Sequence, residues 1–151
     1  MKKLILFFTA MFFSFSALAL EPIVGVWKTI DDETGEAKSL VQIYEYDGKY
    51  FGRVVKLFKN PETTAVGIVG SPKIDGLDII WNMSADGDRF RGGKILDPKK
   101  GKIYTCEIWV AESGDLTVRG KVGPFGRNQT WLKQEDVEII GGFVPVIPKQ
   151  D

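Results

Sequence analysis

The chain of 151 residues contains no histidine and a single cysteine. Without histidine it has neither the Ser-His-Asp nor the Cys-His arrangement of nucleophilic catalysis, and no histidine-ligated metal site. One cysteine excludes an internal disulfide framework and a zinc site built from several thiolates. Basic and acidic side chains balance at 20 each, which leaves no net field to attract nucleic acid. We therefore expect a protein that is not an enzyme and that holds no metal or cofactor.

The N-terminal segment has the three parts of a secretory signal peptide. Lys2 and Lys3 are followed by the apolar run LILFFTAMFFSF, and Ala17-Leu18-Ala19 is a small-x-small cleavage site. The rival interpretation is a transmembrane anchor, but the apolar stretch is barely long enough to span and no basic stop-transfer cluster follows it. Cleavage after Ala19 leaves 132 residues with 18 basic and 20 acidic side chains. We expect this mature chain in the bacterial periplasm or secreted, with no membrane span.

Cys106 would be a lone thiol in an oxidising compartment. An exposed thiol there invites dimerisation, so we expect Cys106 to be buried. It alternates with Tyr104, Ile108 and Val110, where it behaves as a small hydrophobic side chain on one face of a strand.

Hydrophobicity with a period of two residues dominates the rest of the chain, and helical periodicity is nearly absent. Turn-forming residues separate the alternating runs. Asp47-Gly48 joins two of them almost directly, which is a strong hairpin signal, and Asp86-Gly87 and residues 113–115 do the same further on. The pattern predicts eight strands, over residues 24–30, 38–46, 50–58, 77–83, 89–96, 102–111, 116–122 and 127–133.

Eight short antiparallel strands within about 110 residues must protect their edges from pairing with other chains. Closure into an up-and-down barrel does so, and it leaves an interior that can hold one small ligand. A two-sheet sandwich would need longer crossings, and only residues 59–76 provide one. An outer-membrane barrel has the same strand number, but the charged side chains on these strands leave no consistent lipid-facing band. We expect an all-β, eight-stranded antiparallel up-and-down barrel over residues 20–135.

Two segments fall outside the strand pattern. Residues 59–76 form a long irregular stretch with two prolines and three glycines, which is either a lid or binding loop or a poorly ordered connector. Residues 136–151 are apolar but contain two glycines and two prolines, which disfavour a helix. We expect this tail to lie in extended form across the barrel or across a partner.

Several sequence blocks occur in a characteristic order. GVWKT opens the first expected strand, VQIY leads through Asp47-Gly48 to YFGRV, and GGKILDP, GKIY, LTVRG and GRNQTW follow. In this order and spacing the chain resembles a family of small secreted bacterial proteins known only as a domain of unknown function. The resemblance covers nearly all of residues 23–133 and implies a lipocalin-like or streptavidin-like barrel exported to the envelope, with no established activity. The chain departs from the family in a shorter loop after Phe58 and in the additional tail after Gln134.

Gly25-x-Trp27 on the first expected strand is similar to the G-x-W signature of lipocalins. In that family the tryptophan closes the barrel floor under an arginine from the last strand. The resemblance implies this role for Arg127, with the guanidinium over the indole in a cation–π contact of about 0.5–2 kcal/mol.

Strand alternation places Arg127, Gln129 and Trp131 on one face of the last expected strand. If Trp131 points inward, a cation and an amide point inward with it. Buried charge is costly unless it is paired. These groups therefore either form a floor network with Trp27 and a carboxylate, or they are polar anchors in an otherwise apolar cavity. Both interpretations stay open.

Aromatic side chains complete the candidate ligand contacts. Tyr104 shares the face of Cys106, where its ring would line the cavity. Tyr44 and Tyr46 lie on the strand face opposite to that of Val41 and Ile43, and alternation alone does not tell which face is inside. The candidate ligand-binding residues are Trp27, Tyr44, Tyr104, Arg127, Gln129 and Trp131.

These observations favour an exported binding module of the bacterial envelope that holds a small apolar or amphipathic molecule. The alternative is a protein-interaction or envelope-structural barrel that uses residues 59–76 and the tail 136–151, because exposed apolar segments usually bind a partner. The expected partner is accordingly a small molecule or an envelope protein.

Overall fold

The computed structural model describes residues 22–151, and the expected signal peptide, residues 1–19, lies outside the described residues. Eight strands follow one another along the chain, as the alternating pattern predicts. Their bounds are β1 Gly25–Ile30, β2 Ala37–Tyr46, β3 Lys49–Leu57, β4 Asp78–Asp86, β5 Arg89–Asp97, β6 Lys102–Val110, β7 Leu116–Val122 and β8 Phe125–Gln134.

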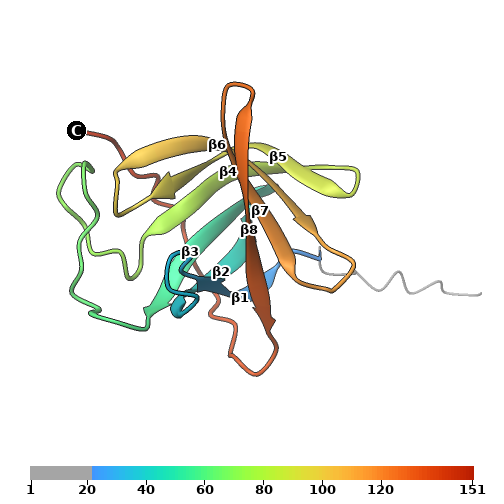
Figure 1. Cartoon of the computed structure of the whole chain (residues 1–151), viewed down its shortest axis with the longest axis horizontal. Coiled ribbons are helices and arrows are strands. Elements are labelled where there is room, and N and C mark those ends of the chain that lie inside the picture. The colour runs from blue at the N-terminus through green and yellow to red at the C-terminus, as the bar shows by residue number, and fades with distance from the viewer. Residues whose placement is uncertain (1–21) are drawn as a thin grey trace, which may run out of the picture.

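The strands form a closed antiparallel barrel in which each strand pairs with its sequence neighbours and β8 pairs with β1 (Figure 1). The pairs that close this seam are Val26 with Gln134, Trp27 with Lys133 and Lys28 with Leu132. Closure satisfies the hydrogen-bonding edges of the first and last strands, which an open sheet would expose. The expected eight-stranded barrel is confirmed, and a two-sheet sandwich is not formed. Within residues 22–151 no helix has the length and apolarity to cross a membrane.

The expected strand bounds are accurate to within two residues except in β4. This strand continues three residues past the expected end at Met83, because residues 84–86 pair with residues 89–91 of β5. Asn82 has a left-handed φ of 56°, so it interrupts the alternation locally without ending the strand. A sequence pattern cannot distinguish such an irregularity from a strand end.

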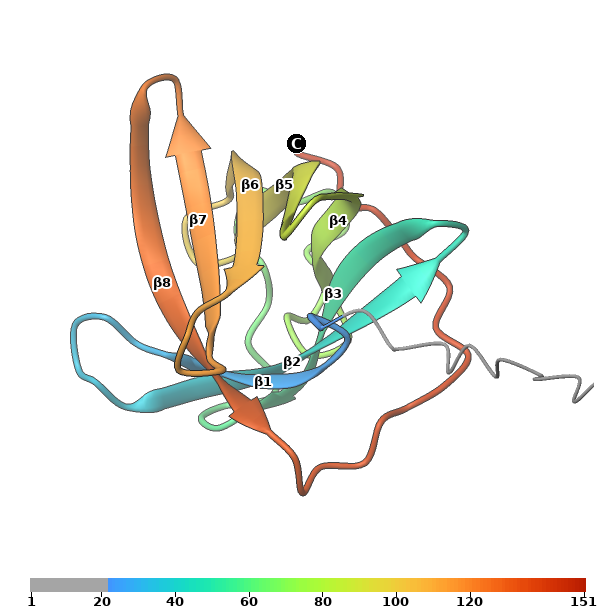
Figure 2. The same ribbon diagram turned by 90° about the vertical axis from the view of Figure 1, so that its right-hand side faces the viewer.

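Because the barrel runs up and down, alternate connections meet at the same end. One end carries the connections from β1 to β2, β3 to β4, β5 to β6 and β7 to β8, formed by residues 31–36, 58–77, 98–101 and 123–124. We call it the open end. The start of β1 and the other three connections lie at the opposite, closed end. Figure 2 shows the β7–β8 hairpin projecting from the barrel at the open end.

The C-terminal tail, residues 135–151, crosses the outside of the barrel (Figure 2). Gln42 on β2 pairs through its side-chain amide with the main chain of Ile140, accepting from the N–H at 2.9 Å and donating to the C=O at 2.6 Å. On β4, Asp78 accepts from the N–H of Val146 at 2.9 Å. The tail thus lies in extended form against the barrel, which is one of the two places expected for it.

The end of the tail holds the long loop at the open end. Val69 donates its N–H to the carbonyl oxygen of Lys149 at 2.8 Å, and Asp151 donates its N–H to the carbonyl oxygen of Gly67 at 3.0 Å. The tail therefore runs from the closed end, where β8 finishes, to the open end. The two segments that lie outside the strand pattern, residues 59–76 and the tail, stabilise each other.

Cys106 is buried, as expected, with only 3% of its surface exposed. It lies opposite Gly93 of β5 and Gly120 of β7 in the sheet register. Burial raises the pKa of its thiol to about 12. The thiol therefore stays protonated at neutral pH, and the protonated form is a poor nucleophile.

We predict that Cys106 is inert in the folded protein. At neutral pH iodoacetamide should leave the native protein unmodified and should alkylate it once in guanidinium chloride, because only unfolding exposes and ionises the thiol. Intact mass measures the modification. Rapid alkylation of the native protein would contradict the buried position.

Gly93 occupies a place on β5 that has no room for a side chain. A Cβ atom there would overlap the carbonyl oxygen of Trp81 and the sulfur of Met83 on β4. Main-chain atoms of the neighbouring strand cannot move aside without disturbing the β4–β5 pairing. The glycine is therefore required by the close approach of the two strands.

We predict that Gly93→Ala destabilises the protein by about 1–3 kcal/mol, the usual cost of adding atoms to a filled site. Gly141→Ala is the matched control, because a Cβ at this exposed tail position meets nothing within 4 Å, and it should leave stability unchanged. Urea denaturation measures both variants. Equal stability of the two variants would contradict the close strand approach.

Candidate functional site

A cavity of about 420 Å³ opens at the open end of the barrel. Its volume suits a small organic molecule, and its lining joins strand residues with residues of the loops 31–36, 59–76 and 98–101. The apolar side chains in the wall include Val54, Ile79, Ile95, Val118 and Trp131. The polar ones among the strand residues include Thr29, Ser39, Tyr104, Arg127 and Gln129.

Some polar groups in the wall satisfy one another. Thr29 on β1 and Ser39 on β2 share a hydrogen bond of 2.7 Å between their hydroxyl oxygens. The indole N–H of Trp131 donates to the side-chain oxygen of Gln129 at 3.2 Å. This bond uses the acceptor of the Gln129 amide, while its nitrogen makes no hydrogen bond with any group in residues 22–151. The amide nitrogen can therefore donate to a molecule in the cavity.

Tyr104 offers a second donor. β6 places it on the same face as Cys106 and Ile108, which are buried. The Tyr104 side chain is itself half-buried, and its hydroxyl has no hydrogen-bond partner in the described part of the chain. Beside it, Gly120 of β7 leaves space, since a Cβ there would have Tyr104 as its nearest neighbour at 3.5 Å. The cavity thus combines apolar side chains in its wall with two hydrogen-bond donors that have no acceptor within residues 22–151.

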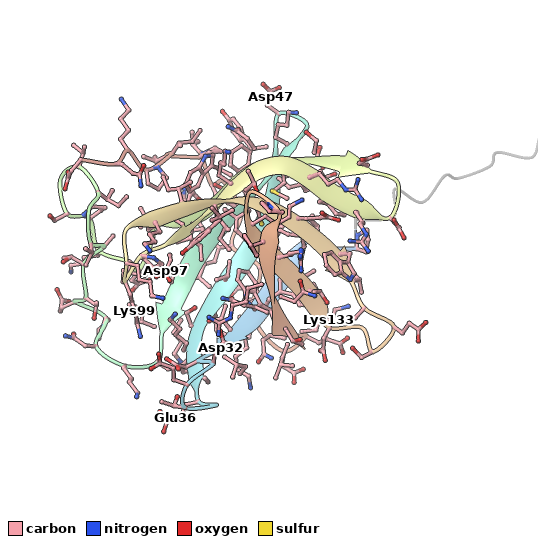
Figure 3. The ribbon with its side chains drawn as sticks, turned by 45° about the horizontal axis from the view of Figure 1, so that its top comes forward. Asp32, Glu36, Asp47, Asp97, Lys99 and Lys133 are labelled. Carbon is pink, nitrogen blue, oxygen red and sulfur yellow. The ribbon has the colours of Figure 1, made fainter. Side chains whose placement is uncertain are left out.

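Charged side chains at the rim of the cavity are paired between segments. Arg127 of β8 donates to Asp32 at 2.7 Å, and Lys59 pairs with Glu36 at 3.0 Å; Figure 3 shows both carboxylates on one side of the molecule. The hydrogen bond from Lys59 to Glu36 raises the pKa of that lysine. Asp31 accepts two backbone N–H bonds within its own loop, which lower its pKa. The rim therefore carries side chains of both signs of charge.

The structure brings together the expected ligand-binding residues of β6 and β8. Tyr104, Arg127, Gln129 and Trp131 all line the cavity. Arg127 lies at the rim, whereas Trp131 is buried. Contact of these residues with a ligand stays a prediction.

Trp27 does not lie under Arg127, so the expected floor contact is wrong. In the register of the β1–β8 seam, Trp27 faces Lys133, and Arg127 is six residues further along β8, or about 20 Å at 3.3 Å per residue. The side chain of Arg127 is 69% exposed at the open end. The indole N–H of Trp27 donates instead to the carbonyl oxygen of Ile23 at 2.9 Å. Trp27 is therefore a packed residue of the closed end.

Tyr44 lies outside the barrel, which corrects its assignment to the cavity. The face of β2 that carries Val41 lines the interior, so the alternate residues Gln42 and Tyr44 point outward and are covered by the tail. The hydroxyl of Tyr44 donates to Asp78 at 2.8 Å, and its ring meets Phe143 edge to face at 5.2 Å between centroids. Burial and the neighbouring carboxylate raise the pKa of Tyr44 well above its ordinary value. Tyr44 thus belongs to the outer surface of the barrel on which the tail packs.

Sequence reasoning missed two groups of residues. On the strands, Thr29, Ser39, Ile79 and Ile95 follow the same alternation as the expected contacts, so a full list of inward positions would have included them. The loop residues Asn60, Thr63 and Ile74 also line the cavity. No periodic signal marks them, because the path of a long loop depends on what covers it.

We predict that Arg127 contributes little to stability. An exposed ion pair such as Arg127–Asp32 is worth at most about 1 kcal/mol, so Arg127→Met should cost less than this. Trp27→Ala, which empties a buried site, should cost about 3–5 kcal/mol. Urea denaturation of both variants measures the difference. An equal loss for the two would contradict the exposed position of Arg127 at the rim.

Comparison with known proteins agrees with this geometry. A solved structure with the same fold is described as "Protein HP1028 from the human pathogen Helicobacter pylori belongs to the lipocalin family". It is 19% identical in sequence and superposes with a TM-score of 0.64 over 76% of this chain and 84% of that one. At this identity the likeness shows the fold alone.

No curated protein matches the chain. The model of a bacterial family described as "Uncharacterized protein conserved in bacteria (DUF2147)" matches residues 25–133, which span the barrel from the start of β1 to Lys133 of β8 and do not include the tail. This confirms the family resemblance drawn from the sequence blocks. The chain belongs to the DUF2147 family.

Proposed function

We propose that this protein is an exported binding protein for a small amphipathic molecule. The observation that carries the proposal is the cavity of about 420 Å³ at the open end of a closed barrel, where apolar side chains of the strands form much of the wall and charged side chains gather at the rim. Small-molecule sites have this make-up, in which apolar contacts supply affinity and a few polar groups fix orientation. The lipocalin described for Helicobacter pylori has the same fold, which supports a barrel interior as the binding place.

The lining defines the chemistry of the ligand. Its apolar part would lie against Val54, Ile95 and Val118. An uncharged acceptor such as a carbonyl or ether oxygen would receive hydrogen bonds from the Tyr104 hydroxyl and the Gln129 amide. A charged group would stay at the rim, because burying it without a partner is costly.

Export is supported by the N-terminal residues. The basic start, the apolar run and the Ala17-Leu18-Ala19 site form a secretory pattern. A periplasmic or secreted binding protein would meet its ligand outside the cytoplasm. A chain without histidine lacks the side chain most often used in general acid–base catalysis, and we propose binding rather than turnover.

We predict that filling the cavity abolishes binding. Gly120→Leu would place a branched side chain beside Tyr104 and Ile95, and it should weaken binding of an apolar naphthylamine dye at least tenfold, measured by dye fluorescence. The matched control is Gly141→Leu, which adds the same side chain at an exposed tail position with no neighbour within 4 Å, and it should bind like the original protein. Circular dichroism checks that both variants keep the fold.

Native mass spectrometry of the protein purified from its own host identifies the bound molecule. We expect a co-purifying small molecule that is reduced in Gly120→Leu and retained in Gly141→Leu. An empty barrel, together with dye binding that both variants share, would rule out the cavity as the binding site.

A second candidate function is protein interaction, which the exposed apolar side chains favour. Val66 and Val69 on the long loop are more than half exposed, as are Ile139, Val144 and Val146 on the tail. Exposed apolar groups gathered on one segment usually mark a contact surface. The two functions use different surfaces of the molecule and are compatible.

A further inference from the structure

The tail contains ten consecutive residues without a polar side chain. Residues 139–148 read IIGGFVPVIP, and they run along the outside of the barrel from the closed end towards the open end (Figure 2). An apolar segment of this length is normally found inside a protein or in an interface. We call residues 139–148 the apolar strip.

The inner side of the strip is fixed to the barrel mainly through its main chain. The two bonds between Gln42 and Ile140 hold its start, and Asp78 holds the N–H of Val146. Between them, Arg53 donates to the carbonyl oxygen of Val144 at 2.8 Å.

One side chain of the strip points inward and anchors its centre. The guanidinium of Arg53 lies 4.3 Å from the centroid of the Phe143 ring, and the same arginine forms a pair of 2.9 Å with Asp78, which is buried. Pro145 is half-buried and Pro148 is buried, so the prolines also face the barrel, and the five branched side chains of the strip do not.

The outer side of the strip is exposed. Five branched apolar side chains remain between 43% and 69% accessible: Ile139, Ile140, Val144, Val146 and Ile147. These side chains form a row on a segment whose main chain is hydrogen-bonded to the barrel. The row therefore has a fixed position on the surface of the molecule. Covering it would remove apolar surface from water, which is favourable.

Charges flank the strip in a complementary way. Glu138 precedes it and Lys149 follows it. Both side chains are exposed, and neither has an ion-pair partner in residues 22–151. If two strips lie antiparallel with their apolar residues in register, Glu138 of each faces Lys149 of the other.

We propose that the strip is a dimerisation surface, and that its partner is the strip of a second copy of this chain in antiparallel orientation. The two-fold axis passes between Phe143 and Val144, the midpoint of the ten residues. A self-complementary patch of this kind closes on itself as a dimer.

The geometry leaves both cavities accessible. Each tail runs from the closed end to the open end, so antiparallel strips place the barrels side by side with open ends facing in opposite directions. Five partly exposed side chains per copy give an interface at the small end for specific complexes. We therefore expect a reversible dimer whose population depends on protein concentration.

Charge exchange at the ends of the strip tests the proposed partner and orientation together. Glu138→Lys and Lys149→Glu should each weaken dimerisation at least tenfold, because each sets like charges opposite one another. The double variant E138K/K149E should restore it, because the pairs re-form with exchanged signs. Sedimentation equilibrium at low salt measures the dissociation constants.

The apolar contact is tested with serine substitutions. Val144→Ser and Val146→Ser should also weaken the dimer, since the main-chain bonds of these residues to Arg53 and Asp78 remain and only the outward side chains change. Val122→Ser is the matched control, because this valine is equally exposed but lies on the β7–β8 hairpin, and its dimer should match that of the original protein.

Any one of three results would overturn the proposal. The first is an original protein that is monomeric at every concentration tested, and the second is a dimer that persists in both serine variants. The third is a double charge variant that dimerises as weakly as the single charge variants. A monomeric protein that co-sediments with phosphatidylcholine vesicles through the strip would identify a lipid surface as the partner instead. Dye binding in the barrel is unaffected by any of these outcomes, so the cavity is judged separately.

Discussion

The pairing of β1 with β8 is the constraint on which the rest of the structure depends. It joins residues near the two ends of the family domain, Val26 with Gln134 and Trp27 with Lys133, and it turns a row of hairpins into a closed wall. Without this seam two strand edges would be open to other chains and the interior would not be enclosed. The register of the seam also fixes how far along the barrel axis each residue of β1 and β8 lies. It sets Trp27 at the closed end and leaves Arg127 at the rim of the open end.

Within the closed wall, small residues decide where the interior is solid and where it is hollow. Gly52 and Gly93 lie where neighbouring strands leave almost no space: a Cβ at Gly52 would be 3.1 Å from Ile80, and one at Gly93 would overlap Met83. At Gly120 the nearest atoms are at ordinary contact distance and the space beyond belongs to the cavity. The same residue type therefore allows tight packing in one part of the barrel and an accessible cavity in another.

The tail adds a second layer to one side of this wall. Asp78 is almost fully buried, which a carboxylate tolerates only with several partners. It has them in Arg53, the Tyr44 hydroxyl and the N–H of Val146. Since the last of these comes from outside the family domain, the tail completes a polar cluster that the barrel alone leaves exposed. The end of the tail then reaches the loop 59–76, which lines the cavity.

The amino-acid sequence alone determined the strands, the barrel and much of the site. Alternation with period two is a local property, so it marked all eight strands and placed Gln129 with Trp131 and Tyr104 with Cys106 on shared faces. The lone cysteine in an apolar row was correctly expected to be buried. These results need only neighbours along the chain.

Tertiary structure decided which face of a strand is inside, how high a residue lies in the barrel, and what covers the outer wall. Tyr44 was placed wrongly because alternation gives two faces without saying which one the barrel encloses. Arg127 was misassigned because its height depends on the register between the first and last strands. The position of the tail depends on contacts such as that of Gln42 with Ile140, which are 98 residues apart in the sequence. Such contacts form only once the barrel has closed, and so no local pattern in the sequence contains them.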